Sequence, residues 1–391
     1  MGILEWIFFV SLFIVFYAYL GYGILLGILV KLKGRSDTQS IPSNDQLPEV
    51  AMVVAAYNEA DIIEQKINNC LAIDYPDDKL HFYFVTDGST DPTPELIRRY
   101  PRIQLFHKPA RAGKMAAVDR VMDRVNEPIT IYSDANAMVN PEAVKLMVRH
   151  FQNDRIGAVA GEKSIRQSET ADASSSGEGI YWRYESLLKK WDYQLYSVVG
   201  AAGELFGIRS SLYEKPEIDT LIEDFVMTLR IAQKGFRVAY EPEARAYETS
   251  SDGLNEELKR KVRICAGGLQ AVWRLAPLLN PFKHGVLSFQ YISHRVLRWT
   301  LAPLALLVIL VTNVLLVKSG DPIFLALMIG QVLFYGSALL GYYLEDFQIR
   351  IKALFIPLYF TFMNLSVYLG LFKLLTGDFS VTWEKAKRKL A

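Results

Sequence analysis

The chain has 391 residues, 51% of them hydrophobic, and its 43 Lys and Arg residues nearly balance 42 Asp and Glu residues. This length allows one sizeable folded domain plus further elements, and the balanced charge gives no reason to expect nucleic acid as a partner. Cys70 and Cys265 form no CxxC pair, and the five histidines form no HExxH motif. The sequence therefore argues against a disulfide framework and against a thiolate or histidine metal site.

Four segments without Asp, Glu, Lys or Arg approach or exceed the roughly 20 residues that cross a bilayer. They are residues 6–30, 299–317, 322–344 and 353–372. The first apolar run is too long for a cleaved signal peptide, and no basic region precedes it. Three further runs in succession argue against a buried helical core. We therefore expect four membrane-spanning helices.

The charges that flank these segments predict two different locations for the C-terminus. Lys31, Lys33 and Arg35 place the following segment in the cytoplasm, so four crossings leave the C-terminus outside. The tail nevertheless carries basic residues at positions 385, 387, 388 and 389, which the same rule keeps inside. Either residues 353–372, which Pro357 interrupts, are re-entrant or interfacial, or residues 277–298 hide another crossing. Four spans with the tail outside remain the expectation, because the charge rule weighs most on early helices.

Between the first two apolar helices, the sequence alternates strands with helices. Residues 49–56, 81–85 and 128–132 have the apolar, β-branched and aromatic content of buried strands, and each run ends in polar residues. This alternation is typical of an α/β fold with a parallel sheet. Ligands bind such sheets at the carboxyl ends of the strands.

Two of the polar strand ends contain candidate binding residues. Ser133, Asp134 and Asn136 can hold a divalent cation and, through it, a diphosphate, because hard oxygen ligands suit Mg²⁺ or Mn²⁺. A simple strand-end turn is the alternative. Asp87 and Gly88 can accept a hydrogen bond from a nucleotide base and let the backbone approach its ring, or they can form an ordinary turn before a helix.

Two charged segments further along are also candidates. Residues 111–114 place two cations around a glycine, which suits either a phosphate or a solvated loop. Glu223 and Asp224 open a helical pattern that ends at Gly235. Acids in a first helical turn also complement the helix dipole, so a structural role is the alternative to catalysis.

Together, these motifs resemble those of the processive-type family 2 glycosyltransferases, which have the GT-A fold and include chitin-oligosaccharide, poly-N-acetylglucosamine, hyaluronan and cellulose synthases. The residues that carry the resemblance are 56–59 (Ala-Tyr-Asn-Glu), 87–91 (Asp-Gly-Ser-Thr-Asp), 111–114 (Arg-Ala-Gly-Lys), 133–136 (Ser-Asp-Ala-Asn), 223–224 (Glu-Asp) and 260–264 (Arg-Lys-Val-Arg-Ile). The resemblance covers almost the whole chain. It implies a Rossmann-like GT-A domain, with a mostly parallel sheet and helices on both faces, beside an α-helical transmembrane region.

The resemblance also implies a division of the chain. The expected parts of the chain are a transmembrane helix (residues 1–30), a linker (31–47), the GT-A domain (48–250), interfacial amphipathic helices (251–298), about three transmembrane helices (299–374) and a basic tail (375–391). The resemblance places the protein in the cell membrane as a multi-pass protein, with its catalytic domain in the cytoplasm. The oligomeric state stays open.

Residue roles follow from the same resemblance. Asp224 is the general base of an inverting transfer, with Glu223 beside it, and Asp134 and Asn136 hold Mg²⁺ or Mn²⁺. The residues expected to bind the donor, a nucleoside diphosphate sugar such as a UDP-sugar, are Ala56, Tyr57, Glu59, Asp87, Gly88, Lys114, Ser133, Asp134, Arg260 and Arg263. Two departures stand out: Asn136 occupies the usual place of a second acid, and Ile264 occupies the place of a Trp that lines the acceptor channel in polymerising members.

Three functions are compatible with these features. The favoured one is a synthase that extends a glycan at the cytoplasmic face of the bilayer. The second is transfer of a single sugar to a lipid acceptor, as in ceramide or polyprenyl-phosphate glycosyltransferases, which the missing Trp and the few spans favour. The third, an inactive membrane scaffold, is disfavoured because Asp87, Asp134 and Asp224 are present.

Overall fold

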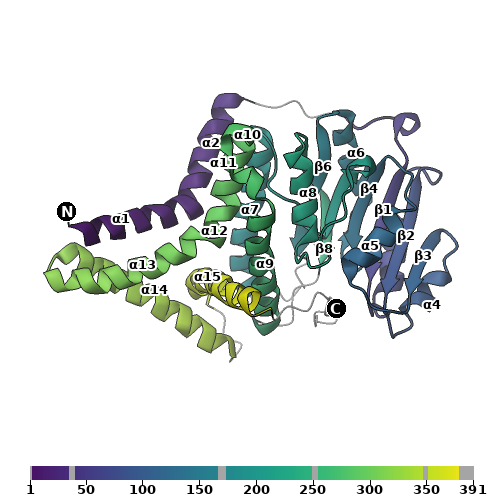
Figure 1. The fold of residues 1–391 in the computed structure, drawn as a ribbon. Coiled ribbons are helices and arrows are strands. Elements are labelled where there is room, and N and C mark those ends of the chain that lie inside the picture. The colour runs from purple at the N-terminus through teal and green to yellow at the C-terminus, as the bar shows by residue number, and fades with distance from the viewer. Residues whose placement is uncertain (1, 35–39, 166–172, 249–253, 347–350, 378–391) are drawn as a thin grey trace.

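The computed structural model describes residues 2–34, 40–165, 173–248, 254–346 and 351–377 (Figure 1). Most of the expected basic tail and parts of the expected linker lie outside the described residues, as does the expected domain boundary near residue 250. In the described part, a globular α/β region lies on one side and a group of long apolar helices projects from the other.

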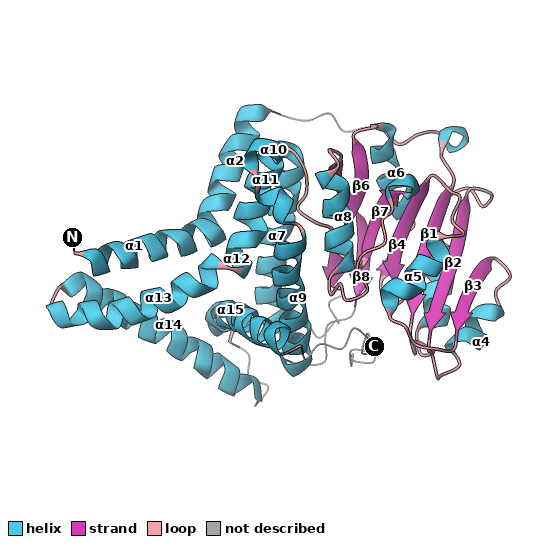
Figure 2. Ribbon diagram, in the orientation of Figure 1, coloured by secondary structure: helices cyan, strands magenta, loops and turns pink. Residues whose placement is uncertain are grey.

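A single eight-stranded sheet, with strand order β3-β2-β1-β4-β7-β6-β8-β5, forms the centre of the globular region (Figure 2). The pairs β1–β2, β2–β3, β1–β4 and β6–β8 are parallel, whereas β4–β7, β6–β7 and β5–β8 are antiparallel. The expected α/β class with a mostly parallel sheet is confirmed. The strands are β1 (Val50–Ala56), β2 (Leu80–Asp87), β3 (Ile103–Lys108), β4 (Ile129–Asp134), β5 (Met138–Val139), β6 (Ile156–Ile165), β7 (Leu205–Arg209) and β8 (Arg237–Glu248).

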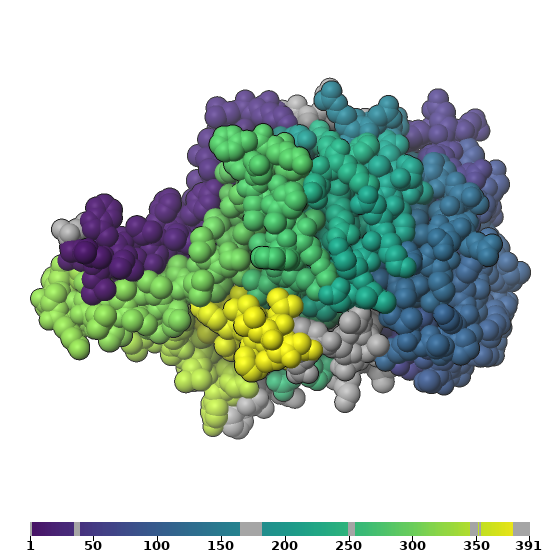
Figure 3. All heavy atoms as spheres, in the orientation of Figure 1, coloured from purple at the N-terminus to yellow at the C-terminus, as the bar shows by residue number. Residues whose placement is uncertain are grey.

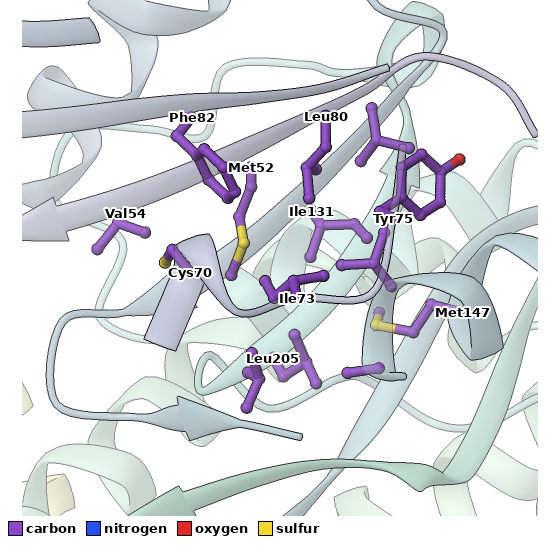
Figure 4. Close-up of a cluster of buried hydrophobic side chains, with 14 of the residues drawn as sticks. Met52, Val54, Cys70, Ile73, Tyr75, Leu80, Phe82, Ile131, Met147 and Leu205 are labelled. Atoms are coloured by element: carbon purple, nitrogen blue, oxygen red, sulfur yellow. The ribbon is translucent and has the colours of Figure 1, made fainter. Parts of the chain in front are cut away.

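The side chains of β1 alternate between two hydrophobic cores, one on each face of the sheet. Val50, Met52 and Val54 belong to one core, and Ala51 and Val53 to the other. Both faces are covered, which is why the strand reads as an unbroken apolar run. Figure 4 shows part of the first core, where side chains from strands and from the segments beside them interdigitate. Burying each of these large side chains, relative to leaving it exposed to water, stabilises the fold by about 1.5–3 kcal/mol.

The helices of the globular region cover both faces of the sheet. The first core is closed by α3, α4 and α6, and the second by α5 and α8. The helices of this region are α3 (Ile63–Leu71), α4 (Thr93–Arg98), α5 (Lys114–Met122), α6 (Ala143–Val148), α7 (Ala173–Leu195), α8 (Glu223–Gln233) and α9 (Leu254–Arg274).

The four apolar segments form helices that are long and apolar enough to cross a membrane: Ile3–Lys33, Leu301–Ser319, Pro322–Leu344 and Ala353–Thr376. The first consists of α1 (Ile3–Phe16), a π-helical turn (Tyr17–Gly21) and α2 (Tyr22–Lys33). The others contain α13 (Leu301–Leu316), α14 (Pro322–Asp346) and α15 (Lys352–Thr376). The connection from α9 to α13 contains three short helices, α10 (Pro281–His284), α11 (Val286–Tyr291) and α12 (Leu297–Trp299), with a second π-helical turn (Ile292–Val296) after α11.

Within the first long helix, α2 packs on α7 of the globular region. A Cβ atom added to Gly23 would lie 2.5 Å from the Tyr184 hydroxyl, and one added to Gly27 would lie 3.2 Å from the ring of Trp191. Glycine therefore lets the two helices approach closely. The buried hydroxyl of Tyr22 donates to the carboxylate of Asp192 on α7. The second half of the first apolar segment is thus anchored to the globular region.

Candidate active site

Three strands bring the predicted motifs to one edge of the sheet. In the parallel register, Ala55 on β1 lies beside Asp134 on β4, and Ala56 lies beside Thr86 on β2. The residues that follow these positions therefore emerge together at the carboxyl edge, where open α/β sheets bind their ligands. Asp87 and Asp134 share this edge although 46 residues of chain lie between them.

A cleft of about 280 Å³, open to solvent, lies at the ends of β1 and β2. The guanidinium group of Arg111 lies over the ring of Tyr57, 3.9 Å from its centroid. Gly88 has φ +70°, and a Cβ atom there would lie 2.6 Å from that of Arg111, so no other residue fits without displacing this loop. The residues that line the cleft are Ala55, Ala56, Tyr57, Val85, Asp87, Arg111, Gly113, Lys114 and Ala117.

The carboxylate of Asp87 is held by the loop that follows β3. Its Oδ2 accepts hydrogen bonds from the backbone amides of Ala112 at 2.6 Å and Gly113 at 2.7 Å. Its Oδ1 pairs with Arg120 at 3.0 Å. Asp87 thereby fixes the wall of the cleft that carries Arg111. This contact was not expected from the sequence, which suggested either a bond from Asp87 to a base or an ordinary turn.

A second cleft, of about 330 Å³, lies next to the first. Lys114 and Ala55 line both clefts. The second is lined further by residues from β4, the segment before β7, and α8: Tyr132, Ser133, Asp134, Gly203, Phe206, Glu223 and Met227, together with Val53, Met115 and Val118. The two clefts thus join the predicted donor-binding residues to Glu223 of the predicted catalytic pair.

Lys114 connects the predicted metal motif to the predicted catalytic pair. Its ammonium group lies 2.9 Å from Oδ1 of Asp134 and 2.8 Å from Oε1 of Glu223. Burial acts against the charged amine, but the two carboxylates outweigh it and raise the pKa of Lys114. Burial likewise opposes the charged form of Glu223, yet the same lysine outweighs it and lowers the pKa of that carboxyl. Two acids and one cation therefore form a single charged unit.

Asp224 has a different environment from its neighbour. Burial, with repulsion from Glu223 as the next largest cause, raises the pKa of Asp224 to about 7. A Cβ atom added to Gly203 would lie 3.4 Å from Oδ2 of Asp224 and 3.7 Å from Nζ of Lys114. The missing side chain at Gly203 therefore leaves space between a carboxylate suited to proton transfer near neutral pH and a fixed cation.

The residues present fit a divalent cation in part. Nδ2 of Asn136 donates to Oε1 of Glu248 at 2.5 Å, and this orients the amide so that its Oδ1, which is buried, has no hydrogen-bond partner. An unsatisfied carbonyl oxygen near a carboxylate is the kind of ligand that Mg²⁺ or Mn²⁺ takes. Across the described segments, however, no three His, Cys, Asp or Glu side chains are grouped closely enough to hold an ion by themselves. A bound diphosphate would have to supply further oxygen ligands.

A buried network behind Asp134 was not predicted. Lys66 donates to Ser133 Oγ at 2.8 Å and to the carbonyl of Ala137 at 2.5 Å, while Ser133 donates to the carbonyl of Glu204 at 3.1 Å. Lys163 pairs with the carboxylates of Glu204 and Glu248. One signal was available in the sequence: Lys66 lies among Ile63, Ile67 and Cys70 on the apolar stripe of an amphipathic helix, where a cation is unusual.

The remaining predicted residues lie around this centre. Arg263 donates to the carbonyl of Leu221 at 3.4 Å and is close enough to favour the charged form of Glu223. Arg260 pairs with Glu257 at 2.9 Å and helps to lower the pKa of Glu204. Glu59 is buried, and its backbone amide donates to Thr93 at 2.9 Å. The segment 260–264 is therefore near the acids, whereas Glu59 lies in the turn after β1.

The fold is that of a solved glycosyltransferase. A mannosyltransferase from Pyrobaculum calidifontis, determined in complex with GDP-mannose and Mn²⁺, superposes with a TM-score of 0.73 over 96% of this chain and 100% of its own, at 21% sequence identity. The sheet, the helices on its two faces and the long apolar helices thus define a GT-A protein with candidate membrane spans.

Part of the sequence matches a family model. Residues 51–215 match the family "Glycosyl transferase family 2". A poly-beta-1,6-N-acetyl-D-glucosamine synthase from Staphylococcus aureus (strain MSSA476) is 27% identical over 242 residues, which cover 59% of this chain and 57% of that protein. A beta-monoglucosyldiacylglycerol synthase from a Synechocystis strain is 27% identical over 209 residues, which cover 50% of this chain and 42% of that protein.

The match over residues 51–215 and the similarity to the synthase confirm the expected resemblance to family 2 glycosyltransferases. The chain's matches span little more than half the length of the synthase and less than half that of the glycolipid enzyme. The two relatives make different products, one a polysaccharide and one a glycolipid, as their names state.

Proposed function

We propose that the protein is an inverting glycosyltransferase that moves a sugar from a nucleoside diphosphate donor, in the first instance a UDP-sugar, to a growing glycan at the membrane. The observation that carries this proposal is the bridge made by Lys114 between Asp134 and Glu223, at 2.9 and 2.8 Å. It joins the cleft suited to a nucleotide with the acid pair suited to activating an acceptor. The catalytic domain would lie on the cytoplasmic side, where such donors are made.

The donor would lie across both clefts. Its base and ribose would occupy the part lined by Tyr57 and Asp87, and its diphosphate would lie near Lys114, with Arg260 or Arg263 added as the site closes. Asp134 and Asn136 would hold Mg²⁺ or Mn²⁺. When bound, this ion neutralises charge that develops on the leaving diphosphate.

Asp224 would act as the base. An acceptor hydroxyl would donate its proton to the carboxylate of Asp224 while its oxygen bonds to C1 of the sugar, and the C1–oxygen bond to the diphosphate would break with its electron pair. This single displacement inverts the configuration at C1. A pKa near 7 supports the role, because such a base is substantially ionised at neutral pH and still accepts a proton.

A second candidate is transfer of one sugar to a lipid. Ile264 stands where polymerising members carry a Trp, and one relative is named as a glycolipid synthase. Both functions require the same donor site, so they differ only in the acceptor.

The test is a screen of the purified protein in detergent or lipid against a panel of UDP-sugars, with GDP-mannose included. Released nucleoside diphosphate identifies the donor, product mass separates a polymer from a single addition, and NMR of the product anomer tests inversion. Retention of configuration would contradict the role of Asp224. Absence of turnover with every donor, while the lipid and detergent conditions keep the protein folded, would favour an inactive scaffold.

A further inference from the structure

Helix α15 contacts the ends of the other apolar helices that lie nearest the globular region. Figures 1 and 3 show α1, α13 and α14 projecting away from that region, whereas α15 lies at their base, in yellow, beside α9. α15 is apolar and has 25 residues, about 37 Å at 1.5 Å per residue, so its length alone does not decide whether it crosses a bilayer.

Contacts between the other three helices identify their two ends. Away from the globular region, Phe8 of α1 packs on Phe324 of α14, with ring centroids 5.6 Å apart, and both belong to a cluster with Leu316 at the end of α13. At the opposite end, Arg298 donates to the carbonyl of Ala18 at 3.0 Å, just before α13 begins. Phe8 therefore marks the end of this helix group that is farther from the globular region, and Ala18 marks the end next to it.

Most contacts of α15 are with the second of these ends, although Phe360 also packs on Phe334, midway along α14, with ring centroids 5.7 Å apart. Leu354 faces Gly341 near the end of α14, because a Cβ atom on Gly341 would lie 3.3 Å from that of Leu354. Ten residues later, Asn364 accepts a hydrogen bond from Tyr19 at 2.8 Å. Tyr368 then donates to the carbonyl of Pro303, near the start of α13, at 2.6 Å.

The last part of α15 lies against the globular region. A Cβ atom added to Gly370 would lie 2.8 Å from the backbone nitrogen of Ala266 and 3.0 Å from the carbonyl oxygen of Val262, both on α9. If α15 continued antiparallel to α14 from the contact at Leu354, Gly370 would instead lie opposite Leu325, at the end marked by Phe324. α15, which is one continuous helix from Lys352 to Thr376, therefore diverges from α14 and runs along the near end instead of toward the far side.

We infer that α15 is an interfacial helix lying along the near side of the bilayer, so the chain crosses the bilayer three times and its C-terminal tail lies on the same side as the globular region. The outward side chains Ile356, Leu365, Phe372 and Leu375 are about half exposed or more and would be covered by the lipid leaflet on that side. This arrangement resolves the conflict between the flanking charges. With three crossings, the basic residues at positions 385, 387, 388 and 389 share a side with Lys31 and Lys33.

The test compares single cysteines in the full chain after Cys70 and Cys265, both buried, are replaced by Ala. Asp154→Cys reports the globular side, because the side chain of Asp154 is fully exposed on that region. Ser319→Cys reports the far side, because it lies in the turn between α13 and α14. Ala391→Cys reports the tail. A membrane-impermeant maleimide is applied to sealed membranes and then to membranes opened with detergent.

We expect Ala391→Cys to follow Asp154→Cys: either both react in sealed membranes, or both react only after the membranes are opened. Ser319→Cys should show the other of these two patterns. Reaction of Ala391→Cys together with Ser319→Cys would mean that α15 crosses and would overturn the inference. Because the three sites are compared with one another, the result does not depend on the orientation of the whole protein or on its catalytic activity.

Discussion

The buried ammonium group of Lys66, in the middle of α3, donates to the hydroxyl of Ser133 at 2.8 Å. The same group donates to the carbonyl of Ala137 at 2.5 Å, so one side chain holds both ends of the turn that contains Asp134 and Asn136. Residues behind metal ligands orient them, and their loss typically costs 10–100-fold in metal affinity or activity.

We therefore expect Lys66→Met to raise the Mn²⁺ concentration needed for half-maximal binding, in the presence of UDP, by roughly 10–100-fold. Manganese EPR measures the free ion directly and does not depend on turnover. Lys145→Met is the matched control, because Lys145 pairs at 2.7 Å with an exposed carboxylate, Asp74, rather than with a residue of this turn. An unchanged Mn²⁺ titration for Lys66→Met would mean that Lys66 does not orient the residues of this site.

The contact between Asn136 and Glu248 explains why an amide occupies the place of a second acid. Asn136→Asp would set two carboxylates against each other where Nδ2 now donates at 2.5 Å. We expect a loss of about 1–3 kcal/mol in the free energy of unfolding without metal, the usual penalty of a buried polar group that loses its partner. Adding Glu248→Gln should recover much of it, since the new amide can donate to the new carboxylate.

Thermal unfolding of the two single variants and the double variant, in detergent and with chelator present, measures this coupling. Additive losses in the double variant would show that the two side chains do not interact in this way.

The sequence predicted the carboxyl edge of the sheet well, because Asp87 and Asp134 directly follow apolar strands and such strand ends meet at one edge. It did not predict the bridge from Lys114 to Glu223 or the bond from Asn136 to Glu248. Both depend on how distant segments pack, and nothing local in the sequence encodes that packing. Helix α15 shows the same limit: apolar length predicts membrane affinity, but only packing against Tyr19 and α9 places the helix at the end of the group next to the globular region.

The pKa of Asp224, raised to about 7, predicts how activity depends on pH. The base must be ionised, so kcat/KM should rise with pH up to a plateau above about 7. Asp224→Asn should lower kcat by roughly 10²–10⁴-fold and abolish this acidic limb, with donor affinity retained. Glu223→Gln is the comparison, because it removes the neighbouring charge but keeps the base. Equal losses of donor affinity and transfer in Asp224→Asn would reassign Asp224 to donor binding.

The same shift has a consequence for stability. The pKa of Asp224 lies above the ordinary value of 3.8 for this side chain, so between 3.8 and about 7 the folded protein binds more protons at this site than the unfolded chain does. The contribution of Asp224 to stability therefore falls as pH rises through this window. Asp224→Asn should make the free energy of unfolding less dependent on pH there. An unchanged dependence would mean that the folded carboxyl titrates normally.

The close contact of α15 with α9 can be tested through glycine. Gly370→Ala places a Cβ atom 2.8 Å from the backbone of Ala266. We expect the free energy of unfolding to fall by about 1–3 kcal/mol, as it does when a core is overpacked. Gly336→Ala, in α14, meets no atom within 4 Å and should be neutral or slightly stabilising, because Ala favours helix. Thermal unfolding in detergent compares the two. Equal effects would mean that α15 does not pack on α9 at this position.

The most direct test of the proposed function is the release of nucleoside diphosphate with transfer of the sugar, measured for the wild-type protein and for Asp134→Ala with Mg²⁺ or Mn²⁺ present. We expect the wild-type protein to transfer sugar from at least one donor, chelator to stop it, and Asp134→Ala to lose several orders of magnitude, because Asp134 is the one carboxylate of the motif 133–136. Full activity of Asp134→Ala in excess chelator would contradict this account.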